Sequence, residues 1–378
     1  MTRKLGKLVA AAGALALALS MSACSQERGG TSGTEATAGS SCDFDASGTI
    51  GVAMPTKSLE RWNRDGAHLK ENLEGMGFKV DLQYADNKPE VQISQIENMV
   101  NAGVEVLVVA SIDGEALDPV LTTAKEAGIP VIAYDRLILN TDSIDYYATF
   151  DNYKVGQMQG EYIEEALDLA NTTETFTFEP FSGSPDDNNA RFFFAGAWDV
   201  LSPYVDSGTL VVKSGKAPAS LDDWQSIGIL GWDGSKAQAE METRLNSFYR
   251  DDKVDVVLSP NDSLALGITQ ALLDDGYTTD DFPVLTGQDA DLANAQNIVK
   301  GLQTMTVWKD TRALGDQVAT MVQQIATCKT VDVNDTETYD NGNFVVPSYL
   351  LDPTVITSDN IIEQLVGSGF YTEEDLQG

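Results

Sequence analysis

The chain has 378 residues, of which 42% are hydrophobic, and its 24 Lys and Arg residues stand against 58 Asp and Glu, giving a formal net charge of −34. This length suits two medium-sized domains with a substantial core, which excludes a wholly disordered chain. A surface this acidic repels phosphate backbones and anionic membranes, so the charge argues against nucleic-acid binding.

The N-terminus has the pattern of an export signal. Three basic residues precede an apolar run at Leu8–Leu19 that is shorter than a membrane span, so residues 1–23 are interpreted as a signal peptide. Cys24 follows small residues and resembles the lipobox cysteine of bacterial lipoproteins, which is acylated; the alternative is an ordinary signal peptide with an incidental cysteine. Residues 24–47 are rich in Gly, Ser, Thr and Ala and are predicted to form a flexible tether. We therefore expect an exported protein, anchored by a lipid to the outer face of the cytoplasmic membrane or periplasmic.

Two further cysteines, Cys42 and Cys328, remain after Cys24. In an exported protein they are a possible disulfide pair, although two separate thiols are equally compatible with the sequence. His68 is the only histidine, and no Cys-x-x-Cys spacing occurs. The acidic run at 332–340 lacks the glycine and the final glutamate of an EF-hand loop and is interpreted as a solvated loop. We expect neither a metal site nor a cofactor.

From Gly48 onward, short β-branched runs alternate with amphipathic stretches of helical period. Strands are expected at Ile50–Met54, Lys79–Tyr84, Val106–Ala110, Val131–Tyr134 and Tyr146–Phe150. Helices are expected at Leu59–Met76, with Ser58 as its N-cap, at Val91–Ala102 and at Leu117–Ala127. Gly77, Gly103 and Gly128 follow these helices as C′ glycines do. Such repeated units predict a parallel, doubly wound α/β sheet.

A second series of the same kind follows. Its strands are expected at Phe176–Phe181, Leu210–Lys213, Val254–Ser259, Val284–Thr286 and Met305–Trp308, and its helices at Phe192–Leu201, Ser235–Tyr249, Leu264–Asp274 and Leu292–Val299. A later helix, Ala313–Ala326, is assigned back to the first lobe, and the strand-like run Val345–Leu351 and the C-terminus to the second. The prediction is two doubly wound parallel-sheet lobes, residues 48–153 plus 310–344 and residues 154–309 plus 345–378. Several crossings between them would form a hinge.

The two lobes share a pattern at their strand ends. Val104–Arg136 and Val254–Asp289 each read strand, polar turn with aspartate, helix, glycine, strand and a final aspartate. Asp135 and Asp289 therefore occupy equivalent places. Lobes that face each other across a cleft would direct both carboxylates at one ligand.

The candidate ligand-binding residues all lie at strand ends or in the turns that follow, where α/β folds bind ligands. They are Lys57, Arg61, Trp62, Asp135, Arg136, Asn152, Asp187 and Asn189 of the Ser184–Asn189 turn, Trp232, Asn261, Asp289 and Lys309. Cations, carboxylates and amides are balanced, which suits an uncharged, hydroxyl-rich ring whose C–H faces pack on aromatic side chains. Each residue also has a structural alternative: Asp135 and Arg136 could pair with each other, the 187–189 segment could cap a helix, and Trp232 could be a core residue.

Several motifs carry a family resemblance: AMPTKSLERW at 53–62, SQIENMV at 94–100, VIAYDRLI at 131–138, YYATFDN at 146–152, GSPDDNNA at 183–190, LSPND at 258–262, GQDAD at 287–291 and VVPSYLL at 345–351. With these, the chain after residue 48 resembles the sugar-binding proteins of ABC importers, in particular the group that binds several monosaccharides and the nearby xylose-binding group. The resemblance implies a type I periplasmic-binding-protein fold, a monosaccharide held between the lobes, an ABC permease as partner, and a monomer. It implies ring stacking by Trp62 and Trp232 and polar contacts by Lys57, Arg61, Asp135, Arg136, Asp187, Asn189, Asn261, Asp289 and Lys309. The turn at Asn261 departs from the family pattern.

Three other functions were weighed. A glycosidase would use paired carboxylates such as Asp135, Asp187 and Asp289, but their cationic and amide neighbours favour permanently ionised acceptors over a general acid. A transcriptional regulator of this fold would carry a helix-turn-helix and a basic face. A sugar receptor that feeds a sensory system stays an alternative to transport. The sequence predicts a binding protein and not an enzyme.

Overall fold

The computed structural model describes residues 44–45 and 47–378. The predicted signal peptide, the lipidation site Cys24, most of the tether and Cys42 lie outside these residues. Within the described part of the chain, no helix is both long enough and apolar enough to cross a membrane.

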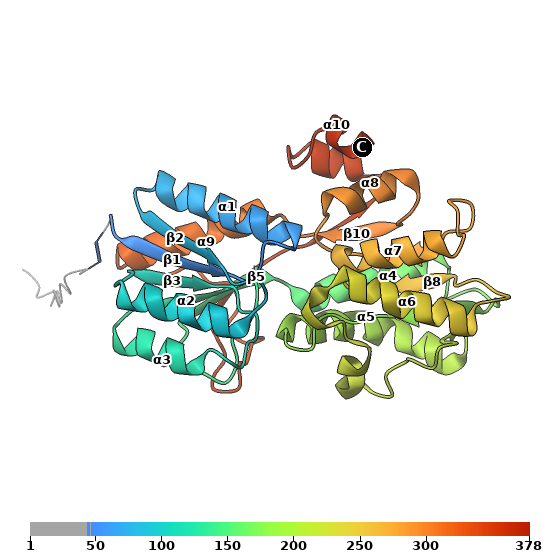
Figure 1. Ribbon diagram of the computed structural model, residues 1–378, viewed down its shortest axis with the longest axis horizontal. Helices are drawn as coiled ribbons and strands as arrows, with labels where there is room; N and C mark the ends of the chain where they lie inside the picture. Colours follow the sequence, from blue (N-terminus) through green and yellow to red (C-terminus); the bar gives the residue numbers. More distant parts are fainter. Residues whose placement is uncertain (1–43, 46) are drawn as a thin grey trace, which may run out of the picture. The chain divides into compact units, whose positions relative to one another are not determined.

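The first lobe is built on a six-stranded parallel sheet (Figure 1). Its strands are β1 (Thr49–Met54), β2 (Lys79–Tyr84), β3 (Val106–Val109), β4 (Val131–Tyr134), β5 (Tyr146–Phe150) and β11 (Ser348–Leu351), in the order β11-β5-β4-β3-β1-β2. Helices α1 (Glu60–Gly75) and α9 (Thr311–Ala326) pack on one face, and α2 (Pro89–Asn101) and α3 (Asp118–Glu126) on the other. Both faces are covered, so the inner strands β1, β3 and β4 read as near-continuous apolar runs.

The second lobe contains a four-stranded parallel sheet and an antiparallel pair. The sheet has the order β7-β6-β8-β9, from β6 (Phe176–Pro180), β7 (Leu210–Val211), β8 (Val256–Leu258) and β9 (Val284–Leu285); the pair is β10 (Met305–Trp308) with β12 (Thr354–Thr357). An isolated parallel bridge between Gln288 and Val307 places β10 beside the continuation of β9. The helices are α4 (Asn152–Ala166), α5 (Asn188–Ser207), α6 (Gly234–Phe248), α7 (Asp262–Asp274), α8 (Leu292–Lys300) and α10 (Glu373–Gln377), with short helical segments at Leu221–Ile227, Leu230–Trp232 and Ile362–Val366.

The chain passes between the lobes three times, from β5 to α4, from β10 to α9 and from β11 to β12 (Figure 1). The third crossing corrects the prediction that the chain returns to the second lobe at residue 345. β11 pairs in parallel with β5, from Ser348 beside Tyr147 to Leu351 beside Phe150. This pairing covers the edge of β5, which would otherwise expose unpaired backbone groups, and so the return follows Leu351.

The sequence signals for the ends of the helices agree with the structure at three glycines and disagree at one N-cap. Gly77, Gly103 and Gly128 have φ values of +100°, +73° and +75°, which confirms their helix-ending role. The predicted N-cap is wrong, because α1 begins at Glu60 after Leu59, and the Ser58 hydroxyl instead lies 2.9 Å from that of Thr56. α4 and β12 were not predicted.

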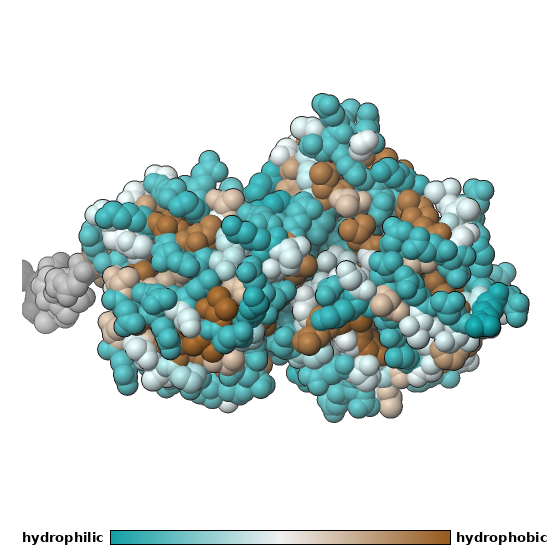
Figure 2. Space-filling view, in the orientation of Figure 1, coloured by the Kyte–Doolittle hydropathy of each residue, from teal (hydrophilic) through white to brown (hydrophobic). Residues whose placement is uncertain are grey.

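The face of the molecule in Figure 2 is mainly hydrophilic, with apolar side chains in small patches, as the acidic composition requires. Cys328 lies two residues after the end of α9 and is disulfide-bonded.

Candidate ligand-binding site

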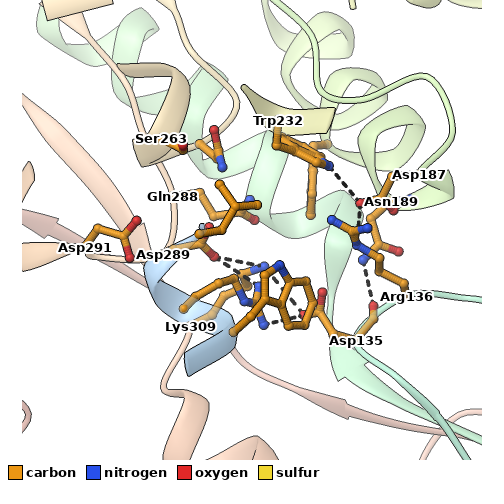
Figure 3. A pocket seen from close by; sticks show the side chains of 15 residues that line it. Asp135, Arg136, Asp187, Asn189, Trp232, Ser263, Gln288, Asp289, Asp291 and Lys309 are labelled. Atoms are coloured by element: carbon orange, nitrogen blue, oxygen red, sulfur yellow. Dashed lines mark hydrogen bonds and ion pairs between the residues drawn. The ribbon is translucent and has the colours of Figure 1, made fainter. Parts of the chain in front are cut away.

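Side chains from both lobes line one cavity (Figure 3). Its walls contain ten of the predicted residues: Arg61, Trp62, Asp135, Arg136, Asp187, Asn189, Trp232, Asn261, Asp289 and Lys309. Leu59, Phe193, Ser263, Gln288 and Asp291 complete the lining. The cavity lies at the carboxyl ends of the strands, where the fold leaves side chains free to meet a ligand.

Arg61 links Asp135 and Asp289, the two aspartates that occupy equivalent places in the sequence pattern shared by the lobes. It lies in the first turn of α1, and its Nη2 donates to Asp135 Oδ1 at 2.9 Å while its Nη1 donates to Asp289 Oδ1 at 3.1 Å. Asp135 directly follows β4 of the first lobe, and Asp289 lies at the corresponding strand end of the second. Both have left-handed backbones, with φ of +59° and +98°, a strained conformation that clusters at functional sites.

Lys309 adds a second cation between the same carboxylates. Its Nζ lies 3.2 Å from Asp289 Oδ1 and 3.7 Å from Asp135 Oδ1. Burial by itself would raise the pKa of Asp135, but the charges of Arg61, Lys309 and Arg136 outweigh it and lower that pKa. Asp135 is therefore a permanently ionised hydrogen-bond acceptor.

The turn before α5 forms another interlobe group. Asp187 caps α5 by accepting from the backbone N–H of Asn189 at 3.0 Å, as the structural alternative proposed. The same carboxylate also forms a 2.9 Å ion pair with Arg136 of the first lobe and accepts from the Trp232 indole at 3.1 Å. Asn189 donates from Nδ2 to the backbone oxygen of Asp135 at 2.7 Å. Capping and cavity lining are thus combined, and Arg136 pairs with Asp187 and not with its neighbour Asp135.

Aromatic rings line both sides of the cavity. Trp62 of the first lobe is 1% exposed, and the guanidinium groups of Arg61 and Arg136 lie 4.5 and 5.1 Å from its ring centroid. In the second lobe, Trp232 and Phe193 meet edge to face with centroids 6.2 Å apart. Phe193 was missed because it lies in an apolar run of α5 that reads as core.

Two predicted residues do not line the cavity. Lys57 is exposed, with its Nζ 4.9 Å from the ring centroid of Tyr84, so it lies outside this cavity and its contact with the ligand stays a prediction. Asn152 is fully buried at the start of α4, behind the wall, where its Nδ2 donates to the Tyr147 hydroxyl at 3.2 Å. Asn261 lines the cavity, although its side-chain oxygen also caps α7.

Two residues outside the prediction hold Arg61 in place. Asp65, one turn further along α1 and fully buried, accepts from Arg61 Nε at 3.2 Å. The buried Tyr134 hydroxyl donates to the other oxygen of Asp65. The i, i+4 spacing of Arg61 and Asp65 was the available sequence signal.

Unpaired polar atoms remain in the cavity wall. Trp62 Nε1 and Gln288 Oε1 are buried without a hydrogen-bond partner among the described residues. Buried polar groups are normally paired, so a donor and an acceptor left in one cavity wall suit a ligand that both accepts and donates hydrogen bonds. Across residues 44–45 and 47–378, no group of three or more His, Cys, Asp or Glu side chains is placed to hold a metal.

Two α/β lobes joined by three crossings around a cavity of balanced charges define a two-lobed solute-binding protein. Residues 50–330 match the family described as "Periplasmic binding protein domain", and the chain belongs to that family. It is 48% identical, over 87% of its length and 92% of the relative's, to the "Multiple sugar-binding periplasmic receptor ChvE" of Rhizobium radiobacter. It is 38% identical, over 86% of its length and 92% of the relative's, to the D-xylose-binding periplasmic protein of Escherichia coli (strain K12).

A solved structure of an ABC transporter solute-binding protein from Clostridium phytofermentans, with bound β-D-glucose, superposes with a TM-score of 0.83 at 50% identity. The match covers 87% of this chain and 99% of that one. These similarities confirm the predicted family and its two-lobed α/β fold.

Proposed function

We propose that the protein captures a free monosaccharide outside the cytoplasm and delivers it to the permease of an ABC importer. The observation that carries the proposal is the cavity itself, which three cations and four carboxylates line together with aromatic rings from both lobes. The names of the relatives and the glucose bound in the similar structure support it.

The chemistry of the walls matches a sugar. A hydroxyl donates one hydrogen bond and accepts others, so it can lie between an ionised acceptor such as Asp289 and a donor such as Lys309. A carboxylate or phosphate ligand would need an excess of cations, which this cavity does not have. The protein is not an enzyme: its relatives are receptors, and the lowered pKa of Asp135 makes this carboxyl unsuited to donate a proton.

The test is a thermal-shift screen of purified protein against neutral aldopentoses, aldohexoses and ketohexoses, followed by calorimetry on each sugar that raises the melting temperature. We expect a dissociation constant in the micromolar range or below, about −8 kcal/mol or better. Asp289→Ala should abolish the sugar-induced shift. Asp316→Ala, at an exposed carboxylate on α9, should preserve it. Turnover of a labelled oligosaccharide by the wild type would contradict a pure binding role.

The proposal includes the cellular location of the protein. Residues 1–23 act as a signal peptide, Cys24 carries the lipid, and residues 24–47 tether a monomeric two-lobed body to the outer face of the membrane. Cys24→Ser should move the protein from the membrane fraction to the soluble extracytoplasmic fraction. Light scattering of the purified body should give one chain per particle.

We also propose that the disulfide partner of Cys328 is Cys42. Cys328 is disulfide-bonded, and the chain has only two other cysteines, of which Cys24 would be consumed by acylation. Peptide mapping without reductant should recover the 42–328 linked peptide, and reduction should lower the free energy of unfolding by about 2–4 kcal/mol. Recovery of Cys42 as a free thiol would refute the pairing.

A further inference from the structure

Arg64 lies on α1 of the first lobe, but most of its partners belong to the second. Its Nη2 donates to Asp291 Oδ1 at 3.0 Å and to the backbone oxygen of Asp289 at 3.4 Å, and its Nη1 donates to the Tyr371 hydroxyl at 2.7 Å. The guanidinium also lies 4.9 Å from the ring centroid of Phe370. Arg64 does not line the ligand cavity.

The second-lobe side of this contact is firmly placed. Tyr371 donates from its hydroxyl to the backbone oxygen of Ala290 at 2.9 Å. Phe370 packs edge to face on Trp308 with centroids 5.3 Å apart, beside the buried cluster that includes Ile361 and Leu365. The C-terminal segment thus holds two aromatic side chains beside the turn that carries Asp289. We call Arg64, Asp291, Phe370 and Tyr371 the Arg64 clamp.

Apart from Asp291, which also lines the cavity, the Arg64 clamp lies outside the interlobe contacts within the cavity. Arg61 contacts Asp289, and Arg136 contacts Asp187, inside the space that a ligand would enter. Hydroxyl groups of a bound sugar would therefore compete for those donors and acceptors. Arg64, Phe370 and Tyr371 do not line the cavity, so a ligand that fills it does not compete for the contacts among them.

We propose that Arg64 is a positioning residue that stabilises the closed arrangement of the lobes and thereby sets the rate at which the ligand leaves, without touching it. This inference rests on the proposed sugar-binding function. Opening the lobes must break the charge-assisted bonds of Arg64 to Asp291 and Tyr371 of the second lobe, which are stronger than bonds between neutral groups, whereas its ion pair with Glu60 lies within α1. Entry of the ligand into open lobes does not require them, so the clamp acts on dissociation more than on association.

The test uses the sugar that gives the largest shift in the thermal screen and stopped-flow tryptophan fluorescence. Arg64→Met keeps the aliphatic length but removes the charge and donors, and should raise the dissociation rate constant about ten-fold, with an association rate constant within about two-fold of the wild type. Tyr371→Phe, which removes one hydroxyl, should raise it by less. The double variant should show a smaller effect than the product of the single ones, because the residues share a bond.

Lys70→Met is the matched control, since Lys70 lies on the same helix and pairs only within it, with Glu74, among the described residues. Equal dissociation rates for Arg64→Met, Lys70→Met and the wild type would overturn the clamp while leaving sugar binding intact. The clamp would also be overturned if Arg64→Met slowed association by the same factor as it speeded dissociation, because that result would indicate a damaged cavity. If the wild type binds no sugar in the screen, the proposed function and the clamp both fall.

Discussion

Asp65→Asn is the sharpest test of how the cavity is built. The side chain keeps its size, but one of its two oxygens becomes an amide group that cannot accept. Arg61 Nε or the Tyr134 hydroxyl then loses its acceptor in a fully buried place. A lost hydrogen bond to a charged group contributes about 1.5–3 kcal/mol. Arg61 keeps Asp135 and Asp289 as partners, so we expect a fall of about 2–3 kcal/mol in the free energy of unfolding, below the cost of an unpaired buried charge.

The affinity should fall as well. Without the Asp65 carboxylate, the Nε side of the Arg61 guanidinium is no longer held in place. The two Nη groups are then less well oriented for their hydrogen bonds to Asp135 and Asp289. We expect sugar affinity to drop about ten-fold, equivalent to about 1.4 kcal/mol. Calorimetry gives the affinity, and urea unfolding of the sugar-free protein gives the stability. Asp65→Glu should not restore the affinity, because its extra methylene has no room in the buried site.

The second lobe supplies a matched control. Glu179 is also fully buried, and it pairs with Arg244 at 3.0 Å and accepts from the Tyr249 hydroxyl at 2.6 Å. None of these three residues lines the cavity. Glu179→Gln should therefore lower stability and leave sugar affinity unchanged. If Asp65→Asn loses stability with the wild-type affinity, then Asp65 is only structural and the reasoning is wrong.

Three further outcomes are expected. A methyl group on Gly183 would lie 2.1 Å from the Trp232 ring. Gly183→Ala should therefore weaken sugar binding in calorimetry and lower the free energy of unfolding by about 1–3 kcal/mol. The control Gly75→Ala, which has open space around the new methyl group, should change neither quantity. Burial raises the pKa of Asp291 to about 7. Between pH 3.8 and about 7 the native side chain keeps a proton that the unfolded one loses, so the wild type should lose stability relative to Asp291→Asn as the pH rises across that range. Urea midpoints of the two proteins that change equally with pH over this range would contradict the prediction. Lys57→Ala should leave sugar affinity unchanged, because Lys57 is exposed outside the cavity. A weaker affinity in calorimetry would show that Lys57 contributes to sugar binding.

Much of the fold was predictable because the strands are buried on both faces. β3 and β4 read as short apolar runs, each after a glycine that ends the preceding helix, and β2, β4 and β5 match the prediction residue for residue. α4 was missed for a physical reason. Its interior carries Gly156 and Gly160, which normally weaken a helix, but a Cβ on Gly156 would lie 1.8 Å from the Phe193 backbone oxygen. The glycines permit close packing on α5, and that tertiary requirement is not visible in the local pattern.

The site was predictable to the extent that it follows strand ends. Asp135 and Asp289 were found as a pair because the two lobes repeat a pattern, and the structure joins them through one arginine. Asp65 and Tyr134 were missed because a residue's role behind the wall depends on which helix packs over which strand. The location of Lys57 outside the cavity was not predictable, because a turn position fixes the location of a backbone but not the direction of a long side chain.

The late position of β11 has a consequence for how the chain matures. The edge of β5 stays unpaired until residues 348–351 have been synthesised, about two hundred residues after β5 itself. Neither lobe is a contiguous stretch of the sequence, so neither corresponds to one uninterrupted segment of the gene. A chain that emerges from the ribosome in order completes its first sheet only near its end.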